Sequence, residues 1–306
     1  MTFSSSLAGA VVVTGASTGI GRATALTLAD AGYSVFAGVH RAADGEALRA
    51  SAPGRLTPLI LDVTDPASVA GAAREVAGAV GAGIAGLVNN AGIGVAEPME
   101  TVPSGDLRRQ YDVNVFGQVT VIQAFLPLLR TGAGRMINIG SVGDRLTLPF
   151  TGPLTSSKWA FAAITEALRL EVRPWGIHVV LVEPALIGTE AVGKVEADSE
   201  RVLERLRADG HTRYAAAYRA TTRRALSREK AGSSPDVVAR TVLRALSAPR
   251  PRTRYLVGKD AHLLAFLARW APDRLFDLVR LRPFGLPAAL GAAVGSDLPQ
   301  PLHRAQ

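Results

Sequence analysis

A glycine-rich turn near the N-terminus constrains the fold of this chain most. A short apolar run, Ala10 to Val13, leads straight into the turn. The segment after the turn, Arg22 to Ala31, is helical in pattern. The pattern predicts a strand, a tight turn and a helix. Glycines let a ligand approach the backbone closely, and the free N–H groups of the helix attract a pyrophosphate, although such a turn is also an ordinary connection. The candidate ligand-binding residues of the turn are Gly15, Ser17, Thr18, Gly19, Ile20 and Gly21.

Further strands alternate with helical segments along the chain. With 306 residues, 48% of them hydrophobic, the chain is long enough for one large α/β domain, and its composition does not require a second. The expected later strands are Ser34 to Val39, Leu59 to Leu61, a buried strand from Gly86, Arg135 to Ile139, a sixth strand before Glu183, and Arg254 to Val257.

Composition excludes several classes of function. The chain has no cysteine, which rules out disulfides and thiolate chemistry and is compatible with a reducing cytoplasm, and its five histidines lack metal-ligand spacing. The net charge of +8 comes from dispersed arginines, so nucleic-acid binding is not favoured. We expect a cytoplasmic protein with no metal and no membrane span, because no apolar run approaches the ~20 residues that a span needs.

Two strand ends carry candidate cofactor residues. A dinucleotide fold that binds NAD normally places an acid after the second strand, but His40 and Arg41 stand there. Basic side chains favour a 2′-phosphate, so NADP(H) is expected rather than NAD(H), unless both residues are simply solvated. After the third strand, Asp62 and Val63 are placed to meet an adenine, or Asp62 caps the helix beginning near Pro66.

Amides and a hydroxyl follow at later strand ends. Asn89 and Asn90 end the buried strand from Gly86 and could lock a loop or touch a cofactor. Asn114 lies in the middle of one long expected helix, Asp106 to Leu129, where an asparagine is usually exposed or a structural hydrogen bonder. The fifth strand delivers Ser141, and Lys158 then opens a long amphipathic helix, so a hydroxyl and an ammonium face one crevice.

These motifs together resemble the short-chain dehydrogenase/reductase family over roughly Gly9 to Gly258. The motifs and residues that match in order and spacing are Thr14-Gly-x-x-x-Gly-x-Gly21, Asn89-Asn-Ala-Gly92, Asn114, Ser141, Lys158 and Glu183-Pro-Ala-Leu-Ile-Gly-Thr189. The resemblance implies a doubly wound, Rossmann-type parallel sheet with the cofactor across its carboxyl edge, and hydride transfer between nicotinamide and a carbonyl or alcohol. It implies that Asn114, Ser141 and Lys158 are catalytic. It adds to the cofactor site Asn89, Ala91, Gly92, Lys158, Pro184, Ile187 and Thr189.

One catalytic position of that family is not filled. Leu154 stands where the family carries a tyrosine, four residues before Lys158. A phenol beside an ammonium has a lowered pKa and can protonate a developing alkoxide, whereas leucine cannot, at an expected cost of roughly 10² to 10⁴ in rate. The replacement donors that the sequence offers are Asp144, Thr151, Thr155, Tyr214 and Tyr218, each with an ordinary alternative: a solvated loop acid, helix caps, or aromatic packing.

The C-terminal third departs from simple strand and helix alternation. Residues 191–232 are helical, charged and rich in arginine, which predicts a substrate lid inserted into a single domain of residues 1–262, or a solvated hairpin. Residues 263–306 form an expected helical extension. Its amphipathic part, His262 to Leu281, packs beside the substrate pocket or a second subunit, or lies on a membrane surface. A hydrophobic substrate is suggested by Leu146, Leu148, Phe150 and Leu186.

The leading hypothesis is an NADP(H)-dependent ketoreductase or dehydrogenase for a bulky hydrophobic carbonyl or alcohol, possibly a secondary metabolite, with the usual tyrosine missing. The alternatives are a non-redox enzyme on the same scaffold (a cyclase, isomerase or dehydratase), a non-catalytic NADP-binding protein, and a variant whose tyrosine has been replaced. Resemblance also implies a homo-oligomer, a dimer or tetramer.

Overall fold

A seven-stranded parallel sheet forms the centre of the structure, a computed structural model that describes residues 9–52, 54–81, 83–189, 192–282 and 286. The strand order is β3-β2-β1-β4-β5-β6-β7, so the direction of winding reverses between β1 and β4, as in a doubly wound fold. The strands are β1 (Ala10–Val13), β2 (Ser34–Val39), β3 (Leu56–Ile60), β4 (Gly86–Asn89), β5 (Arg135–Ile139), β6 (His178–Pro184) and β7 (Arg254–Val257).

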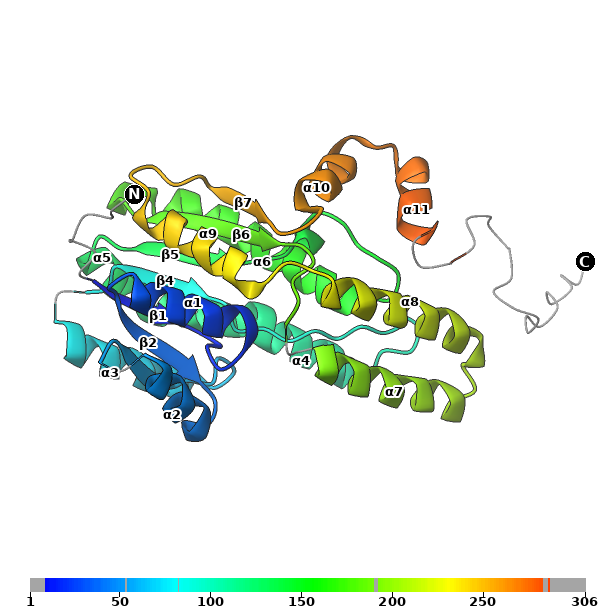
Figure 1. Cartoon of the computed structure of the whole chain (residues 1–306), viewed down its shortest axis with the longest axis horizontal. Helices are drawn as coiled ribbons and strands as arrows, with labels where there is room; N and C mark the ends of the chain where they lie inside the picture. Colours follow the sequence, from blue (N-terminus) through cyan, green and yellow to red (C-terminus); the bar gives the residue numbers. More distant parts are fainter. Residues whose placement is uncertain (1–8, 53, 82, 190–191, 283–285, 287–306) are drawn as a thin grey trace, which may run out of the picture.

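Helices cover both faces of the sheet (Figure 1). Alternate residues of a strand point to opposite faces, and accordingly Val11 and Val13 belong to one core cluster and Val12 to the other. The first cluster includes side chains of α1 (Gly19–Asp30), α2 (Ala42–Ser51) and α9 (Pro235–Ser247). The second includes side chains of α3 (Pro66–Val80), α5 (Gly117–Thr131) and α6 (Gly152–Glu171). The predicted Rossmann-type sheet is therefore confirmed.

The long helix expected around Asn114 is present but not uniform. It consists of α4 (Ser104–Tyr111), one π-helical turn (Asp112–Phe116) and α5. Within the described residues, the combined helix of residues 104–131 is the only one long and apolar enough to cross a membrane by length and composition. Its α5 part contributes Phe125 and Leu129 to the core, so this criterion is weak evidence for a span.

Several predicted boundaries and one capping assignment were wrong. The third strand is Leu56–Ile60 rather than Leu59 to Leu61; it is an edge strand, where Pro58 removes no bond from the sheet interior. Helix α1 begins at Gly19, and α6 begins at Gly152, with a proline in its first turn. Asp65, rather than Asp62, caps α3 by accepting a hydrogen bond from the Ala67 N–H.

The expected lid and extension are helical. The segment for which a lid was expected consists of α7 (Val192–Ala208) and α8 (Thr212–Lys230), which pack on each other through Val202, Leu203, Leu206 and Tyr218. The extension begins as two helices, α10 (Ala261–Trp270) and α11 (Asp273–Leu281), because Pro272 interrupts the predicted continuous segment. The Pro/Gly/Ala-rich tail, apart from Leu286, and residue 191 of the predicted lid lie outside the described residues.

Candidate active site

Asn90 holds the glycine turn against the end of β4. Its side-chain amide donates hydrogen bonds of 3.0 Å to the carbonyl oxygens of Thr14 and Gly15, and the Thr14 hydroxyl accepts from the N–H groups of Asn90 and Ala91. Gly15 has a φ of +63°, and a Cβ on Gly21 would lie 2.1 Å from the Gly15 carbonyl oxygen. The turn therefore requires glycine at both positions. It is fixed before any ligand arrives.

The helix that follows this turn begins in a way that could hold a pyrophosphate. Thr18 starts α1 without a side-chain cap, and the first turn of α1 has no acid, so the helix N-terminus can accept an anion. Gly19 has a φ of +54°, and a Cβ on it would lie 3.4 Å from Thr189, which follows β6. The segment after β6 therefore lies directly against the glycine turn. Ser17 is partly exposed, whereas Ile20, Pro184 and Ile187 contribute mainly to packing.

The basic residues after β2 have acidic neighbours. Arg41 is exposed and makes two hydrogen bonds, of 2.9 and 2.8 Å, with the carboxylate of Asp44. His40 Nδ1 lies 3.9 Å from an Asp62 carboxylate oxygen, and the other oxygen of that carboxylate accepts from Thr64. Val63 is buried. The predicted pair is therefore at the strand end, but its positive charge is partly offset.

The two asparagines after β4 have different surroundings. Asn89 is 1% exposed, and its amide donates to the Asn138 side chain at 2.8 Å, which in turn donates to the Thr165 hydroxyl at 2.9 Å. These contacts join β4, β5 and α6 inside the core. The Asn89 side chain therefore belongs to the interior, whereas Asn90 and Ala91 are partly exposed and Gly92 is exposed.

Three buried amides on one helix face hold the segment after β4. Gln110, Asn114 and Gln118 are four residues apart, and each is at most 2% exposed. Asn114 accepts from the Ile93 N–H at 2.9 Å and donates to the Ile93 carbonyl at 3.0 Å, while the other two amides bind Val95, Ile93 and Ala91 backbone atoms. The π-helical turn adjusts the helix at Asn114, and such turns often occur at functional sites. Asn114 is thus a structural hydrogen bonder.

Ser141 and Lys158 converge on the end of β5. The Lys158 ammonium donates a 3.1 Å hydrogen bond to the carbonyl of Ile139, two residues before Ser141. The Ser141 oxygen accepts from the Gly143 N–H at 3.0 Å, and within the described residues its hydroxyl donates no hydrogen bond, so it is available to a substrate oxygen. Burial lowers the pKa of Lys158 to about 8, against a smaller opposing effect of Asp144.

Leu154 provides an apolar wall at this site. It is half-buried in the first turn of α6, and its Cδ2 lies 3.7 Å from the position that a Cβ on Gly94 would occupy. Its carbonyl accepts from the Ser157 hydroxyl at 2.7 Å, and Ser157 also accepts from Gln110 and Asn114 at 3.2 Å. The backbone around the missing tyrosine is therefore firmly held.

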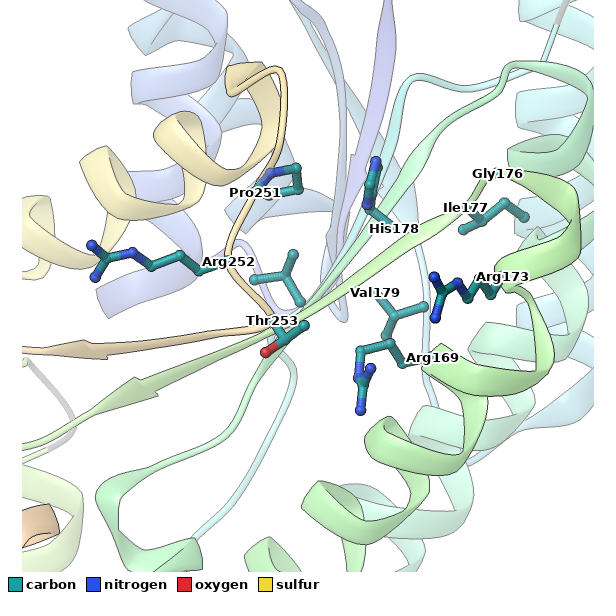
Figure 2. Close-up of a pocket in the computed structure, with 10 residues that line it drawn as sticks. Arg169, Arg173, Gly176, Ile177, His178, Val179, Pro251, Arg252 and Thr253 are labelled. Carbon is teal, nitrogen blue, oxygen red and sulfur yellow. The ribbon is translucent and has the colours of Figure 1, made fainter.

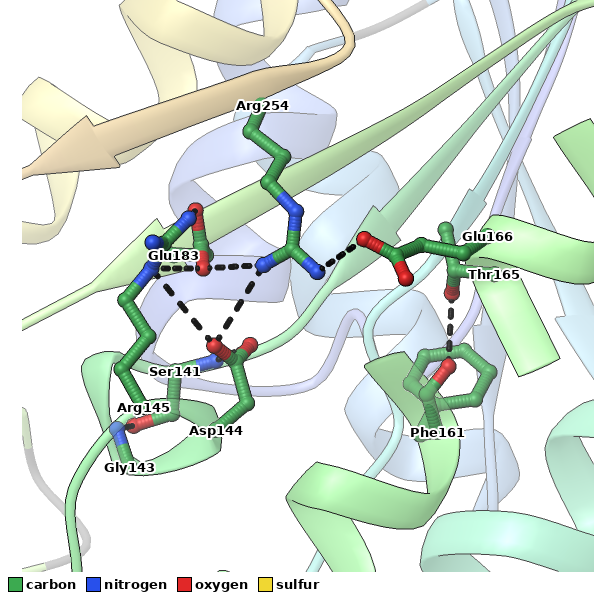
Figure 3. Close-up of polar contacts among 9 residues, drawn as sticks. All are labelled: Ser141, Gly143, Asp144, Arg145, Phe161, Thr165, Glu166, Glu183 and Arg254. Atoms are coloured by element: carbon green, nitrogen blue, oxygen red, sulfur yellow. Dashed lines mark hydrogen bonds and ion pairs between the residues drawn. The ribbon is translucent and has the colours of Figure 1, made fainter. Parts of the chain in front are cut away.

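Asp144 is buried behind Ser141, which overturns the expectation of a solvated loop acid. Its side chain is fully buried, and one carboxyl oxygen accepts a 3.4 Å hydrogen bond from the Ser141 N–H (Figure 3). Glu183, equally buried, is bound by Arg145 at 2.6 and 2.9 Å and by Arg254 at 2.7 Å. Burial and a hydrogen bond with Glu183 raise the pKa of Asp144 to about 8. Asp144 therefore keeps its proton and supports the loop from its interior side.

The hydroxyl candidates on other elements are already occupied. Tyr218 is 2% exposed and donates to the Ala96 carbonyl at 2.8 Å, and burial raises its pKa to about 12. Tyr214 donates to Glu100, and this bond raises its pKa. Thr151 donates to the Leu148 carbonyl and Thr155 to the Thr151 carbonyl, at 2.8 and 2.9 Å. Neither tyrosine replaces the phenol of the family.

Helices α7 and α8 rest on the segment after β4. Phe150, in left-handed backbone conformation with a φ of +66°, packs edge-on against the rings of Tyr214 and Tyr218. Ion pairs join Arg205 of α7 to Glu97 and Arg213 of α8 to Glu100. Of the predicted apolar lining, Leu146 is buried and Leu148, Phe150 and Leu186 are partly buried.

A separate cavity of about 330 Å³ lies at the opposite, amino-terminal edge of the sheet (Figure 2). It is bordered by Arg169, Arg173, His178 and Arg252, and Figure 2 shows the Arg252 side chain pointing away from the other two arginines. It does not touch Ser141 or Lys158, and ligands of doubly wound folds bind at the carboxyl edge. This cavity is therefore not the candidate active site.

Sequence reasoning missed several residues that build the site. Gln110 and Gln118 were not among the predicted site residues, yet they fix the segment after β4, whereas Asn90 locks the glycine turn as one of its two predicted roles. The spacing of Gln110, Asn114 and Gln118 was a usable signal, because residues four apart share one helix face. The burial of Asp144 left no such signal, since its partners come from distant strands.

Comparison with known proteins agrees with this geometry. The family model described as short chain dehydrogenase matches residues 9–200. An NADPH-dependent 3-dehydrocapnine reductase from Ornithobacterium rhinotracheale is 34% identical, with 88% of this chain and 94% of the relative covered. Human retinol dehydrogenase 5 is 37% identical over 88% of this chain and 86% of its own. A short chain dehydrogenase from Burkholderia cenocepacia J2315, solved with NADP, superposes with a TM-score of 0.67 at 27% identity, covering 90% and 97% of the two chains.

The matched region contains the glycine turn, Ser141 and Lys158, and it extends over more than half of the 306 residues. The relatives named above as reductase and dehydrogenase are oxidoreductases matched over most of their length. The chain therefore belongs to the short-chain dehydrogenase/reductase family and is an enzyme of that type.

Proposed function

We propose that this enzyme is an NADP(H)-dependent oxidoreductase acting on a bulky hydrophobic carbonyl or alcohol. The proposal rests on three features that lie at the carboxyl edge of the sheet. They are the glycine turn held by Asn90, the Ser141 hydroxyl that donates no hydrogen bond within the described residues, and the Lys158 ammonium bound to the Ile139 carbonyl. Together they can bind a dinucleotide, orient a substrate oxygen and supply a proton.

NADP(H) is the cofactor that we propose, and when bound it supplies or accepts the hydride. The turn from Gly15 to Gly21 and Thr189 would hold the pyrophosphate region, and Lys158 the nicotinamide ribose. His40 and Arg41 would face the 2′-phosphate. The contact of Arg41 with Asp44 weakens the preference for NADP(H) over NAD(H) but does not remove it, because an exposed ion pair exchanges readily for a phosphate. The named cofactors of the reductase and of the Burkholderia structure support the same choice.

Lys158 is the proton donor that we propose in place of the absent phenol. Its pKa of about 8 is close to neutrality, where a general acid works best. Lys158 is a partly exposed residue, whereas the Asp144 side chain is fully enclosed. Ser141 would hold the substrate oxygen with its free O–H, and the ammonium would hand a proton to that oxygen directly or through one water. Asp144 would act only by supporting the Ser141 backbone.

The substrate that we propose is hydrophobic. The loop after Ser141 carries Leu148 and Phe150, and Leu154 replaces a polar phenol with an apolar wall. The name of the human relative, a retinol dehydrogenase, is consistent with a large apolar substrate in this family branch.

We further propose a homo-oligomer, a cytoplasmic dimer or tetramer. Phe116 beside α5 and Trp159 on α6 are 60% and 50% exposed. Large apolar side chains in such positions favour a covered helix face.

A second candidate is a non-redox reaction in the same pocket. The specific observation in its favour is that Leu154 packs beside Gly94, as a shape-determining side chain would. In this case the substrate would change without a change in oxidation state, and cofactor would not be consumed.

The test is a titration of the purified chain with NADPH and NADH, followed by a panel of apolar ketones and aldehydes. The proposal predicts tighter binding of NADPH and its oxidation by at least one carbonyl compound. Saturation by NADPH without oxidation across the panel, but with an isomerised or cyclised product, would establish the second candidate instead.

A further inference from the structure

The first helix of the C-terminal extension exposes its larger apolar side chains. Leu263, Phe266 and Trp270 of α10 are 57%, 61% and 67% exposed. Their spacing of three and four residues places them on one helix face. The face turned toward the protein carries Ala261 and Ala265, which are buried. The buried side of this helix is therefore made of small apolar residues, and large apolar side chains lie on its exposed side.

The second helix also exposes apolar side chains, although its buried residue is large. Leu275 and Val279 of α11, four residues apart, are exposed, while Phe276 is buried under the Arg280 guanidinium. Arg280 also donates to the Thr147 carbonyl at 3.3 Å, which ties α11 to the loop following Ser141. Figure 1 shows α10 and α11 together at one side of the molecule, beyond β7. We call the exposed residues Leu263, Phe266, Trp270, Leu275 and Val279 the outer apolar face.

Basic side chains border this face. Arg269, Arg274 and Arg282 are exposed, and within the described residues none of them forms an ion pair, whereas Arg280 pairs with Asp277. Residues 261–282 hold four arginines against two aspartates, which gives a net charge of +2 with histidine neutral. The whole chain carries +8. An anionic surface complements this border.

We propose that the outer apolar face is a docking surface for an anionic lipid bilayer. Leucine, phenylalanine and tryptophan side chains would enter the headgroup region, and the bordering arginines would contact lipid phosphates. Helices of 10 and 9 residues are about 15 Å long, half the ~30 Å of a hydrocarbon core, so they lie on the bilayer and do not cross it.

The charge of the face argues against a second copy of the chain as the occupant. Two copies meeting here would bring into one interface two sets of exposed arginines, Arg269, Arg274 and Arg282, which form no ion pair among the described residues. In each copy, helices α10 and α11 contain two acids, and Asp277 already pairs with Arg280. Only Asp273 would be left to pair with an arginine of the other copy. Like charges facing each other oppose association, whereas a bilayer containing phosphatidylglycerol offers many opposite charges.

The experiment measures cosedimentation of the full chain with vesicles. Phosphatidylcholine vesicles containing phosphatidylglycerol should carry down most of the protein, pure phosphatidylcholine vesicles much less, and added salt should weaken binding. Turnover is not needed, so the result does not depend on the proposed reaction.

The variant Phe266→Ser with Trp270→Ser should reduce the bound fraction at least tenfold. The matched control is Leu170→Ser with Trp175→Ser, which removes two side chains of 58% and 49% exposure elsewhere on the surface and should leave binding unchanged. Retained NADPH binding and an unchanged circular dichroism spectrum would show that both variants are folded.

Equal vesicle binding by the parent and the Phe266/Trp270 variant would overturn the proposal, as would no binding by the parent. Suppose that the parent does not bind vesicles, and that light scattering shows a dimer for the parent and a monomer for the Phe266/Trp270 variant. The outer apolar face is then an interface between two copies of the chain.

Discussion

The Lys158 ammonium donates a 3.1 Å hydrogen bond to the carbonyl oxygen of Ile139, so the last residue of β5 sets how far the lysine reaches. One N–H is used by the protein, and the remaining donors can serve a ribose hydroxyl and a substrate oxygen. Because Ser141 follows Ile139 by two residues, lysine and serine are positioned by the same strand end.

A lysine that donates the reacting proton makes the rate of carbonyl reduction depend on pH. With a Lys158 pKa of about 8, the ammonium form predominates below that value. At saturating NADPH the rate should be level below about pH 7 and fall about tenfold per pH unit well above pH 8. Lys158→Met should cost roughly 10² to 10⁴ in kcat and remove this limb. A variant that keeps the same limb would show that another group titrates.

Asp144 predicts a pH dependence of stability. Its raised pKa of about 8 means that the folded chain binds more protons than the unfolded chain, whose aspartate has a pKa of about 4. The free energy of unfolding should therefore fall as pH rises from about 4 to 8.

The variant Asp144→Asn removes this titration and can still donate a hydrogen bond to Glu183. Urea unfolding at each pH gives the free energy of unfolding of the variant minus that of the parent. This difference should increase by on the order of 1 to 3 kcal/mol as the pH rises from 6 to 9. A constant difference between the two proteins across this range would contradict a neutral Asp144.

The contrast between Asp144 and the glycine turn shows what could be predicted from the sequence. The turn, the strands β1, β2, β5 and β7, and the placement of Ser141 after β5 were predicted correctly, because spacing within a short segment decides them. The burial of Asp144 depends on Glu183, Arg145 and Arg254, of which two come from other strands. Contacts of that range leave no trace in local sequence.

The same distinction applies to Asn114 and Asn89. Their amide side chains marked both positions as special, but their partners could not be read from the chain. Asn114 binds the Ile93 backbone 21 residues away, and Asn89 binds Asn138 49 residues away. The π-helical turn at Asn114 arises from packing. The break between α10 and α11 arises from one proline, Pro272, in an otherwise periodic segment.

The glycine turn gives a prediction with an internal control. Gly21→Ala would place a Cβ 2.1 Å from the Gly15 carbonyl and 2.5 Å from the Asn90 amide, so the turn must open. NADPH affinity should fall at least ~100-fold, since the backbone N–H groups lose their arrangement. Gly78→Ala in α3 meets nothing within 4 Å and should instead stabilise the chain by about 0.5 to 1 kcal/mol with unchanged affinity. Equal affinity for both variants, measured by calorimetry, would place the cofactor elsewhere.

Restoring a phenol at position 154 tests whether the rest of the site is ready for redox chemistry. In Leu154→Tyr the ring would start one helical turn before Lys158 and beside Gly94, which has no side chain to obstruct it. The nearby ammonium would lower the phenol pKa and make it an efficient acid.

If Lys158 currently works alone, Leu154→Tyr should raise the rate of carbonyl reduction by roughly 10² to 10⁴. Leu154→Phe has nearly the same shape without the hydroxyl and should give no such gain, which separates chemistry from packing. A loss of the native activity in both variants, with NADPH affinity intact, would mean that the apolar wall of Leu154 is itself required. The pocket would then be adapted to a reaction that does not use a phenol.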